Sequence, residues 1–184
     1  MSQNSTNSSL HIKRLVLAAM FLAVGFLLPF LTAQNQQLGQ MLLLMHLPVF
    51  LCGLICGWKF GGLVGFILPI SRSLIMGMPP MFPVAFAMAF ELAAYGIVVA
   101  IVYALLKKRN ILTLYIAIIA AMLVGRVIWG LLMWIQLTAG DGMFTLQAFL
   151  TGAFVNAWPG IIVQLVLIPI IIFALERAKL IPLK

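Results

Sequence analysis

The sequence predicts an all-α membrane protein with six transmembrane helices and both termini in the cytoplasm. Of its 184 residues, 65% are hydrophobic and only 8% are charged, and the mean hydropathy is +1.21. Soluble domains carry about 25% charged residues, so water is not the solvent of this chain. Each bilayer crossing takes about 20 mainly apolar residues, which leaves room for about six crossings and none for a soluble domain.

Six apolar runs follow a polar N-terminal segment. Residues 1–12 are rich in Ser, Asn and Gln and are expected to form a disordered cytoplasmic tail. The remainder, 13–184, is expected to be a single transmembrane domain. Its apolar runs cover residues 13–31, 41–57, 60–77, 82–106, 111–137 and 147–176. The second and third runs are short and nearly contiguous, so we expect them to form a helical hairpin that turns within residues 57–62.

The basic residues indicate the orientation of the chain. Nine of the eleven occur at every second boundary between runs: Lys13, Arg14, Lys59, Lys107, Lys108, Arg109, Arg177, Lys179 and Lys184. The loops at 32–40, 77–81 and 138–145 carry none. Because positive residues collect on the cytoplasmic side, the pattern predicts a multi-pass plasma-membrane protein with both termini inside. It also argues against nucleic-acid binding, since the basic residues are distributed as topology requires.

Three charged residues lie inside apolar runs, where each costs at least about 2.5 kcal/mol. They are Arg72, Glu91 and Arg126. Counting about 1.5 Å per residue places Arg72 and Glu91 near the midplane and Arg126 about 20 Å from the cytoplasmic side. Glu91 can neutralise one arginine, and the sequence leaves open which. The surplus charge favours a ligand with a carboxylate, which matches a guanidinium group. We expect Arg126 to contact this ligand and Arg72, at the depth of Glu91, to be structural.

Further polar and aromatic side chains complete the candidate binding site. They are His46, Tyr95, Trp129, Asn156 and Trp158. Tyr95 and Trp129 each lie about one helical turn from a charged residue and share its helix face. Asn156 falls in the outer half of the last run, and Trp158 follows it by two residues. For the aromatic residues and His46, packing or anchoring at the membrane interface is the alternative interpretation.

A pair of small residues marks the first helix. Ala19 and Ala23 are four residues apart, a spacing that lets another helix approach closely in lipid. The approaching helix can belong to a partner protein or to the same chain. The sequence alone favours neither alternative strongly.

Enzymatic and metal-binding functions are not expected. One in-span glutamate and one outer histidine do not supply an acid–base pair, a metal set or an activated nucleophile. Cys52 and Cys56 lie in an apolar run without the partner ligands of a metal site. The sequence also lacks the Gly-x-x-x-x-Gly-Lys-Ser/Thr motif of ATP-binding loops. No cofactor is expected.

These features in combination resemble the S components of energy-coupling factor (ECF) transporters. The resemblance covers nearly the whole chain. It rests on the six runs, the pair Ala19 and Ala23, the polar loop at 32–40, and the segments 46–49, 53–61 and 78–80. It is the coincidence of these loose motifs, and no single signature, that indicates the family.

The resemblance implies a substrate-binding subunit that captures a vitamin outside the cell and closes the loop at 32–40 over it. Ala19 and Ala23 would meet a transmembrane coupling protein, and two ATPase subunits would hydrolyse ATP. Similarity to pantothenate-type members makes pantothenate the first candidate. Riboflavin, folate, nicotinate and biotin are the alternative cargoes, and a non-transport membrane assembly protein is the alternative function.

Overall fold

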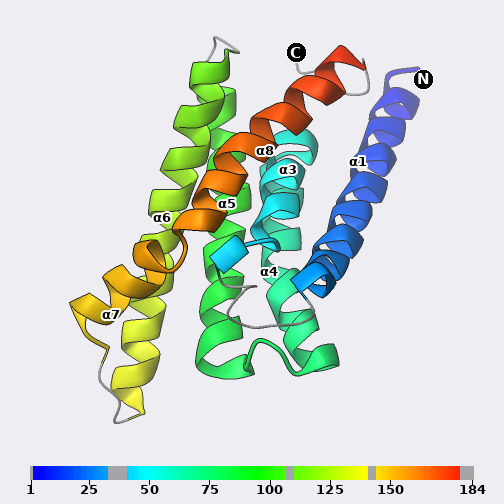
Figure 1. Ribbon diagram of the computed structural model, residues 1–184. Helices are drawn as coiled ribbons and strands as arrows, with labels where there is room; N and C mark the ends of the chain where they lie inside the picture. The colour runs from blue at the N-terminus through cyan, green and yellow to red at the C-terminus, as the bar shows by residue number, and fades with distance from the viewer. Residues whose placement is uncertain (1, 33–40, 107–109, 141–143, 179–184) are drawn as a thin grey trace.

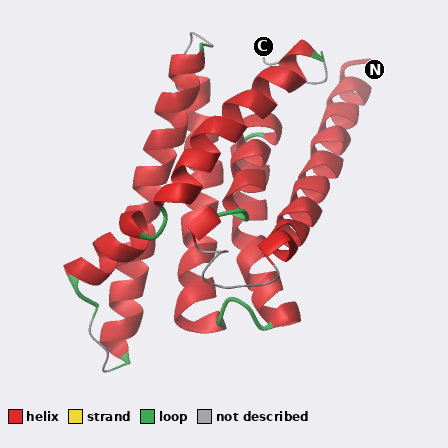
Figure 2. Cartoon of the chain, viewed as in Figure 1, coloured by secondary structure: helices red, strands yellow, loops and turns green. Residues whose placement is uncertain are grey.

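The computed structural model describes residues 2–32, 41–106, 110–140 and 144–178, with backbone only for residues 2–9, 31 and 32. Within these ranges the chain is helical apart from short turns, and they contain no strand (Figure 2). The elements in chain order are α1 (Ser2–Leu27), the 3-10 helix η1 (Leu28–Thr32), α3 (His46–Cys56), α4 (Trp58–Met76), the π-helix η2 (Met81–Ala85), α5 (Phe86–Leu105), α6 (Ile111–Ala139), α7 (Leu146–Leu150), the π-helix η3 (Thr151–Val155) and α8 (Trp158–Arg177).

Five helical stretches of the described residues are long and apolar enough to cross a bilayer. They are Leu10–Phe30, Trp58–Met76, Met81–Leu105, Ile111–Ala139 and Leu146–Arg177. The predicted class, an all-α membrane protein, is therefore confirmed.

The helix α3 is shorter than the run that predicted it. It has 11 residues, a length of about 16 Å, and so extends across about half of the hydrocarbon core. Leu43 has a φ of 51°, which is not a right-handed helical value, so α3 begins only after it, at His46. Most of α3 is buried against its neighbours. The expected span over 41–57 is thus a short buried helix, and a count of six crossings stays a prediction.

The expected hairpin of α3 and α4 is present, with a turn shorter than predicted. A single residue, Gly57, separates the helices, and its φ of 94° is a value that favours glycine. Close packing among α3, α4 and α5 depends on three further glycines, Gly53, Gly61 and Gly96. A Cβ on Gly53 would lie 2.5 Å from the carbonyl oxygen of Gly96, and one on Gly61 would lie 2.6 Å from the Cα of Gly53. Small residues at such crossings let helix backbones approach in lipid.

The helix α5 lies in the middle of the bundle, against α3, α4 and α6 (Figure 1). The helix α1 packs on α3 and α4, while α8 contacts α3 and α6. The start of α1, the turn between α3 and α4, the end of α5, the start of α6 and the end of α8 lie at one end of the molecule. The two described ends of the chain are therefore on the same side, although which side faces the cytoplasm stays a prediction.

Two differences from the predicted elements have simple causes. Helix α1 extends back to Ser2, where the sequence predicts a disordered tail through residue 12. Extending a helix is much easier than nucleating one. The sixth run is divided into α7, η3 and α8, with a turn at Asn156 and Ala157. Pro159 explains that break, because proline lacks an N–H and its ring clashes with the preceding turn.

Candidate functional site

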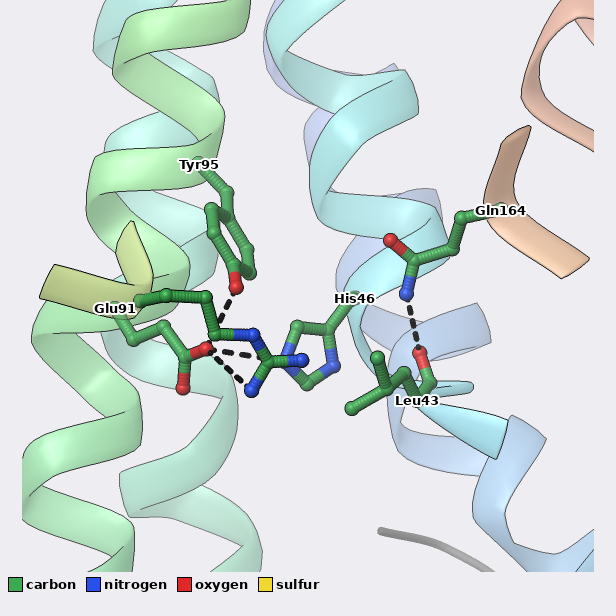
Figure 3. A network of polar contacts seen from close by, with 6 residues as sticks. Leu43, His46, Glu91, Tyr95 and Gln164 are labelled. Carbon is green, nitrogen blue, oxygen red and sulfur yellow. Dashed lines mark hydrogen bonds and ion pairs between the residues drawn. The ribbon is translucent and has the colours of Figure 1, made fainter. Parts of the chain in front are cut away.

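Glu91 and Arg126 form an ion pair inside the bundle (Figure 3). Arg126 Nη1 lies 3.1 Å from Glu91 Oε1, and the two residues are 6% and 1% exposed. The same carboxylate oxygen accepts a hydrogen bond of 2.6 Å from the hydroxyl of Tyr95, one helical turn further along α5. One carboxylate on α5 thus links α5 to α6 and fixes the position of a tyrosine ring.

This pairing shows which arginine Glu91 meets, and it bears on the expected division of roles between the two arginines, which stays a prediction. The sequence assigned the structural role to Arg72 on the basis of depth, but Glu91 pairs with Arg126. The faces of α5 explain the choice. Glu91 and Tyr95 share a face toward α6, where Gly125 leaves space for the Tyr95 ring that a Cβ would fill.

The helix α4 packs on a different face of α5. A Cβ on Gly65 would meet the carbonyl group of Leu92, and one on Gly61 would lie 2.8 Å from the carbonyl oxygen of Gly96. Leu92 and Gly96 are each one residue beyond Glu91 and Tyr95, and one residue rotates the helix face by about 100°. Arg72 lies seven residues beyond Gly65 on α4, about 10 Å closer to the helix end at Met76, so it is not at the depth of Glu91 as the sequence suggested.

Arg72 is a buried cation that pairs with no acid among the described residues. It is 5% exposed, and its Nε donates a 3.2 Å hydrogen bond to the carbonyl oxygen of Met78. Its Nη1 is buried without a hydrogen-bond partner in the described part of the chain. Because buried donors are normally satisfied, Arg72 has unused capacity to bind an acceptor.

Glu91, Arg126 and Tyr95 together are called the Glu91 cluster. His46, the first residue of α3, lies at its edge. It is 3% exposed, and its ring centroid is 5.4 Å from that of Tyr95. Its Nε2 is 4.0 Å from Glu91 Oε1, too far for a hydrogen bond. Neither ring nitrogen has a hydrogen-bond partner among the residues that the structure describes. His46 is the second buried polar group here with unused capacity.

Gln164 is a residue of this network that the sequence reasoning missed. It is 1% exposed in α8, and its Nε2 donates to the carbonyl oxygen of Leu43 at 3.3 Å (Figure 3). The same oxygen accepts a 2.9 Å bond from the backbone N–H of His46. The helix α8 thus holds the turn that positions His46. The signal in the sequence was an amide in an apolar run, which needs a partner as a charge does.

A model of the family "ECF transporter, substrate-specific component" matches residues 13–172, most of the chain. The chain belongs to this family. No curated protein and no solved structure matches it. S components are transport subunits and not catalysts, so the family implies a small-molecule substrate and partner subunits of an ECF module. A buried polar cluster in such a subunit is a candidate binding site for the substrate.

Three predicted site residues of this S component lie outside the Glu91 cluster. Asn156 and Trp158 are exposed, Trp158 by 58%. Trp129 packs in an aromatic group with Phe144 and Phe149, at centroid distances of 5.9 and 6.3 Å. Trp129 lies on α6, Asn156 lies in the turn after η3, and Trp158 is the first residue of α8. The predicted roles of these three residues in binding remain untested.

A groove of about 390 Å³ lies between α6 and α7 of the S component. It is lined by apolar side chains such as Trp134 and Phe149, and Thr145 is the one polar residue of its lining. Since none of its lining residues is charged, it offers an anionic or cationic cargo no counter-charge. The Glu91 cluster, and not this groove, is therefore the candidate site.

The small-residue pair of α1 faces away from the other described helices. Ala19 and Ala23 are both exposed. The inward face of α1 instead uses Ala18, which is 4% exposed, and Gly25, whose added Cβ would lie 2.5 Å from the Leu68 side chain. Packing against the described residues of the chain therefore does not explain the pair.

Replacing Gln164 with Leu is expected to weaken the turn that holds His46. Loss of one neutral hydrogen bond should lower the free energy of unfolding by about 0.5–1.5 kcal/mol, because Leu43 retains only its bond from the His46 backbone. Thermal unfolding of the detergent-purified protein measures this. The control is Gln147→Leu on the exposed surface of α7. Equal melting temperatures for the two variants would contradict a role for Gln164.

Proposed function

We propose that this S component binds a small carboxylate vitamin, with pantothenate as the first candidate, and delivers it through an ATP-driven ECF module. The observation that carries the proposal is Arg72. It is buried, has an unpartnered nitrogen, and pairs with no acid among the described residues. Glu91 pairs with Arg126, so Arg72 is the arginine of the apolar helices whose charge no described acid neutralises.

A carboxylate is the group that best complements this arginine. A guanidinium group presents paired donors that match the two oxygens of a carboxylate. A charge in a low-dielectric site is costly unless it is paired, so an anionic ligand would stabilise Arg72. A cationic vitamin would meet repulsion from the same group. The proposed binding residues are Arg72, His46 and the cluster of Glu91, Arg126 and Tyr95.

Access from the outside agrees with the position of Arg72. We infer that both termini are cytoplasmic, because the basic residues follow the positive-inside rule. The start of α4 lies at the same end as the described chain ends, and its last residue, Met76, lies at the other end. Arg72 is four residues before Met76, about 6 Å from the proposed outer end of α4. A cargo arriving from outside would reach it first.

Two alternatives have weaker support. A neutral vitamin such as riboflavin would leave Arg72 without a counter-charge, and folate, nicotinate and biotin remain alternative acids. A non-transport assembly protein could use Arg72 to bind a partner helix. Mass spectrometry of ligand that co-purifies in detergent separates these alternatives, because only the transport function requires a bound small molecule.

Replacing Arg72 with Gln should remove the preference for an acid. We expect pantothenate to bind about 10–100-fold more weakly, as for the loss of a hydrogen bond to a charged group. Panthenol, in which an alcohol replaces the carboxylate, should bind the variant and the wild type equally. Calorimetric titration measures both ligands. Lys59→Gln, at an exposed position of the same helix, is the control. If the wild type binds panthenol as tightly as pantothenate, a neutral cargo becomes the better hypothesis.

A further inference from the structure

The imidazole of His46 and the carboxylate of Glu91 face each other across a short gap. Nε2 of His46 and Oε1 of Glu91 are 4.0 Å apart, so no direct hydrogen bond joins them. Both residues are at least 97% buried, yet neither nitrogen of the ring has a hydrogen-bond partner among the described residues. Buried polar atoms rarely remain unsatisfied, which indicates that another group occupies the gap in the working protein.

A single oxygen atom can bridge a separation of 4.0 Å. It can lie at a hydrogen-bond distance of about 2.8 Å from Nε2 and from the carboxylate at the same time. The carboxylate has capacity for it, because an ionised carboxylate offers about four acceptor sites. Two of these are used by Tyr95 and Arg126.

The chemistry of the two sides determines what that oxygen belongs to. A neutral imidazole can donate from Nε2, and an ionised carboxylate can only accept. The bridging atom must therefore accept one hydrogen bond and donate another. A hydroxyl group or a water molecule does both, whereas an ionised carboxylate has no proton to donate and an ammonium group cannot accept. Of the two, the hydroxyl is the group that a cargo can carry. A ligand carboxylate would also be repelled by Glu91.

We propose that His46 and Glu91 form a subsite for a hydroxyl group of the cargo. The proposed function has Arg72 bind the carboxylate of the cargo, and the inference rests on it in this respect. Together, Arg72 and the subsite specify a hydroxy acid. The tight turn at Leu43, held by Gln164, fixes the imidazole at the required distance. Arg126 and Tyr95 hold the carboxylate through its Oε1. Each partner of the hydroxyl is thus positioned before the cargo arrives.

The test compares three probes by calorimetric titration of the detergent-purified S component. Pantothenate carries a carboxylate and hydroxyl groups, biotin carries a carboxylate and no hydroxyl, and riboflavin carries hydroxyls and no carboxylate. In His46→Phe, which keeps an aromatic ring without nitrogens, pantothenate should bind about tenfold more weakly. His46→Gln, which retains a donor, should recover most of that loss. A pantothenate analogue without hydroxyls should bind the wild type about tenfold more weakly than pantothenate does. It should bind His46→Phe about as weakly as it binds the wild type, because the hydroxyl and the imidazole take part in one interaction.

Each outcome decides the proposal. If His46→Phe binds pantothenate normally, or if the wild type binds biotin and not pantothenate, the hydroxyl subsite is wrong while the carboxylate proposal stands. If the wild type binds riboflavin and not the acids, and His46→Phe weakens this binding, the subsite stands and the carboxylate proposal is wrong. Absence of binding for all three probes overturns both. The analogue measured on the wild type gives the answer even where a variant does not fold.

Discussion

Replacing Arg126 with Gln is expected to lower the free energy of unfolding by about 3–5 kcal/mol, the range for removing one partner of a buried ion pair. The variant leaves the Glu91 carboxylate buried, and among the described residues the Tyr95 hydroxyl is then its one remaining hydrogen-bond donor. The cost therefore comes from an uncompensated charge. We expect low expression and a reduced melting temperature in detergent.

The double variant Arg126→Gln with Glu91→Gln tests this cause directly. It removes both charges, and an amide oxygen at position 91 can still accept from the Tyr95 hydroxyl. Most of the lost stability should return, because no buried charge remains. Arg177→Gln, which removes an exposed cation at the end of α8, is the control. A double variant no more stable than the single one would contradict the explanation.

The pairing also changes what is expected of ligand binding. The sequence analysis assigns Arg126 to the ligand, which implies that Arg126→Gln weakens binding with little effect on folding. Because the partner of Arg126 is Glu91, we now expect a loss of stability to accompany any loss of affinity. Arg72→Gln is the variant expected to weaken binding with little effect on folding, since Arg72 pairs with no described acid.

The sequence could identify the charged residues of the site but could not pair them. The cost of a charge in lipid marks Arg72, Glu91 and Arg126 whatever the fold. Their pairing depends on the rotation of each helix, and an error of one residue turns a side chain by about 100°. The position of Gly125 beside Tyr95 fixes that rotation in α5 and α6, and it is visible only in three dimensions.

Hydropathy also could not distinguish a crossing helix from a buried one. The apolar run at 41–57 has the composition of a membrane span, but α3 has 11 residues and is covered mainly by protein. Lipid and protein interiors both select apolar side chains, so the run does not reveal which of them surrounds it. The left-handed conformation of Leu43 that shortens the helix has no signal in the sequence, because non-glycine residues rarely adopt it.

Replacing both Ala19 and Ala23 with Trp is expected to abolish vitamin uptake while leaving ligand binding by the isolated S component nearly unchanged. Both alanines are exposed on α1, and the inward packing of that helix uses Ala18 and Gly25 instead. Folding should therefore tolerate the larger side chains. A helix of the coupling protein that approaches this face would not, since close contact in lipid depends on small residues.

The measurement has two parts, uptake by cells that contain the complete transporter and calorimetric binding by the purified subunit. A matched control is the double variant Leu123→Trp with Val127→Trp. These residues have the same four-residue spacing and are 53% and 54% exposed on α6, which lies across the bundle from α1. The control should retain uptake, because exposed bulk by itself does not prevent function. Normal uptake by the double variant Ala19→Trp with Ala23→Trp would show that the coupling protein binds another face. Loss of binding together with uptake would instead place Ala19 and Ala23 in the folding of the subunit, contrary to their exposure.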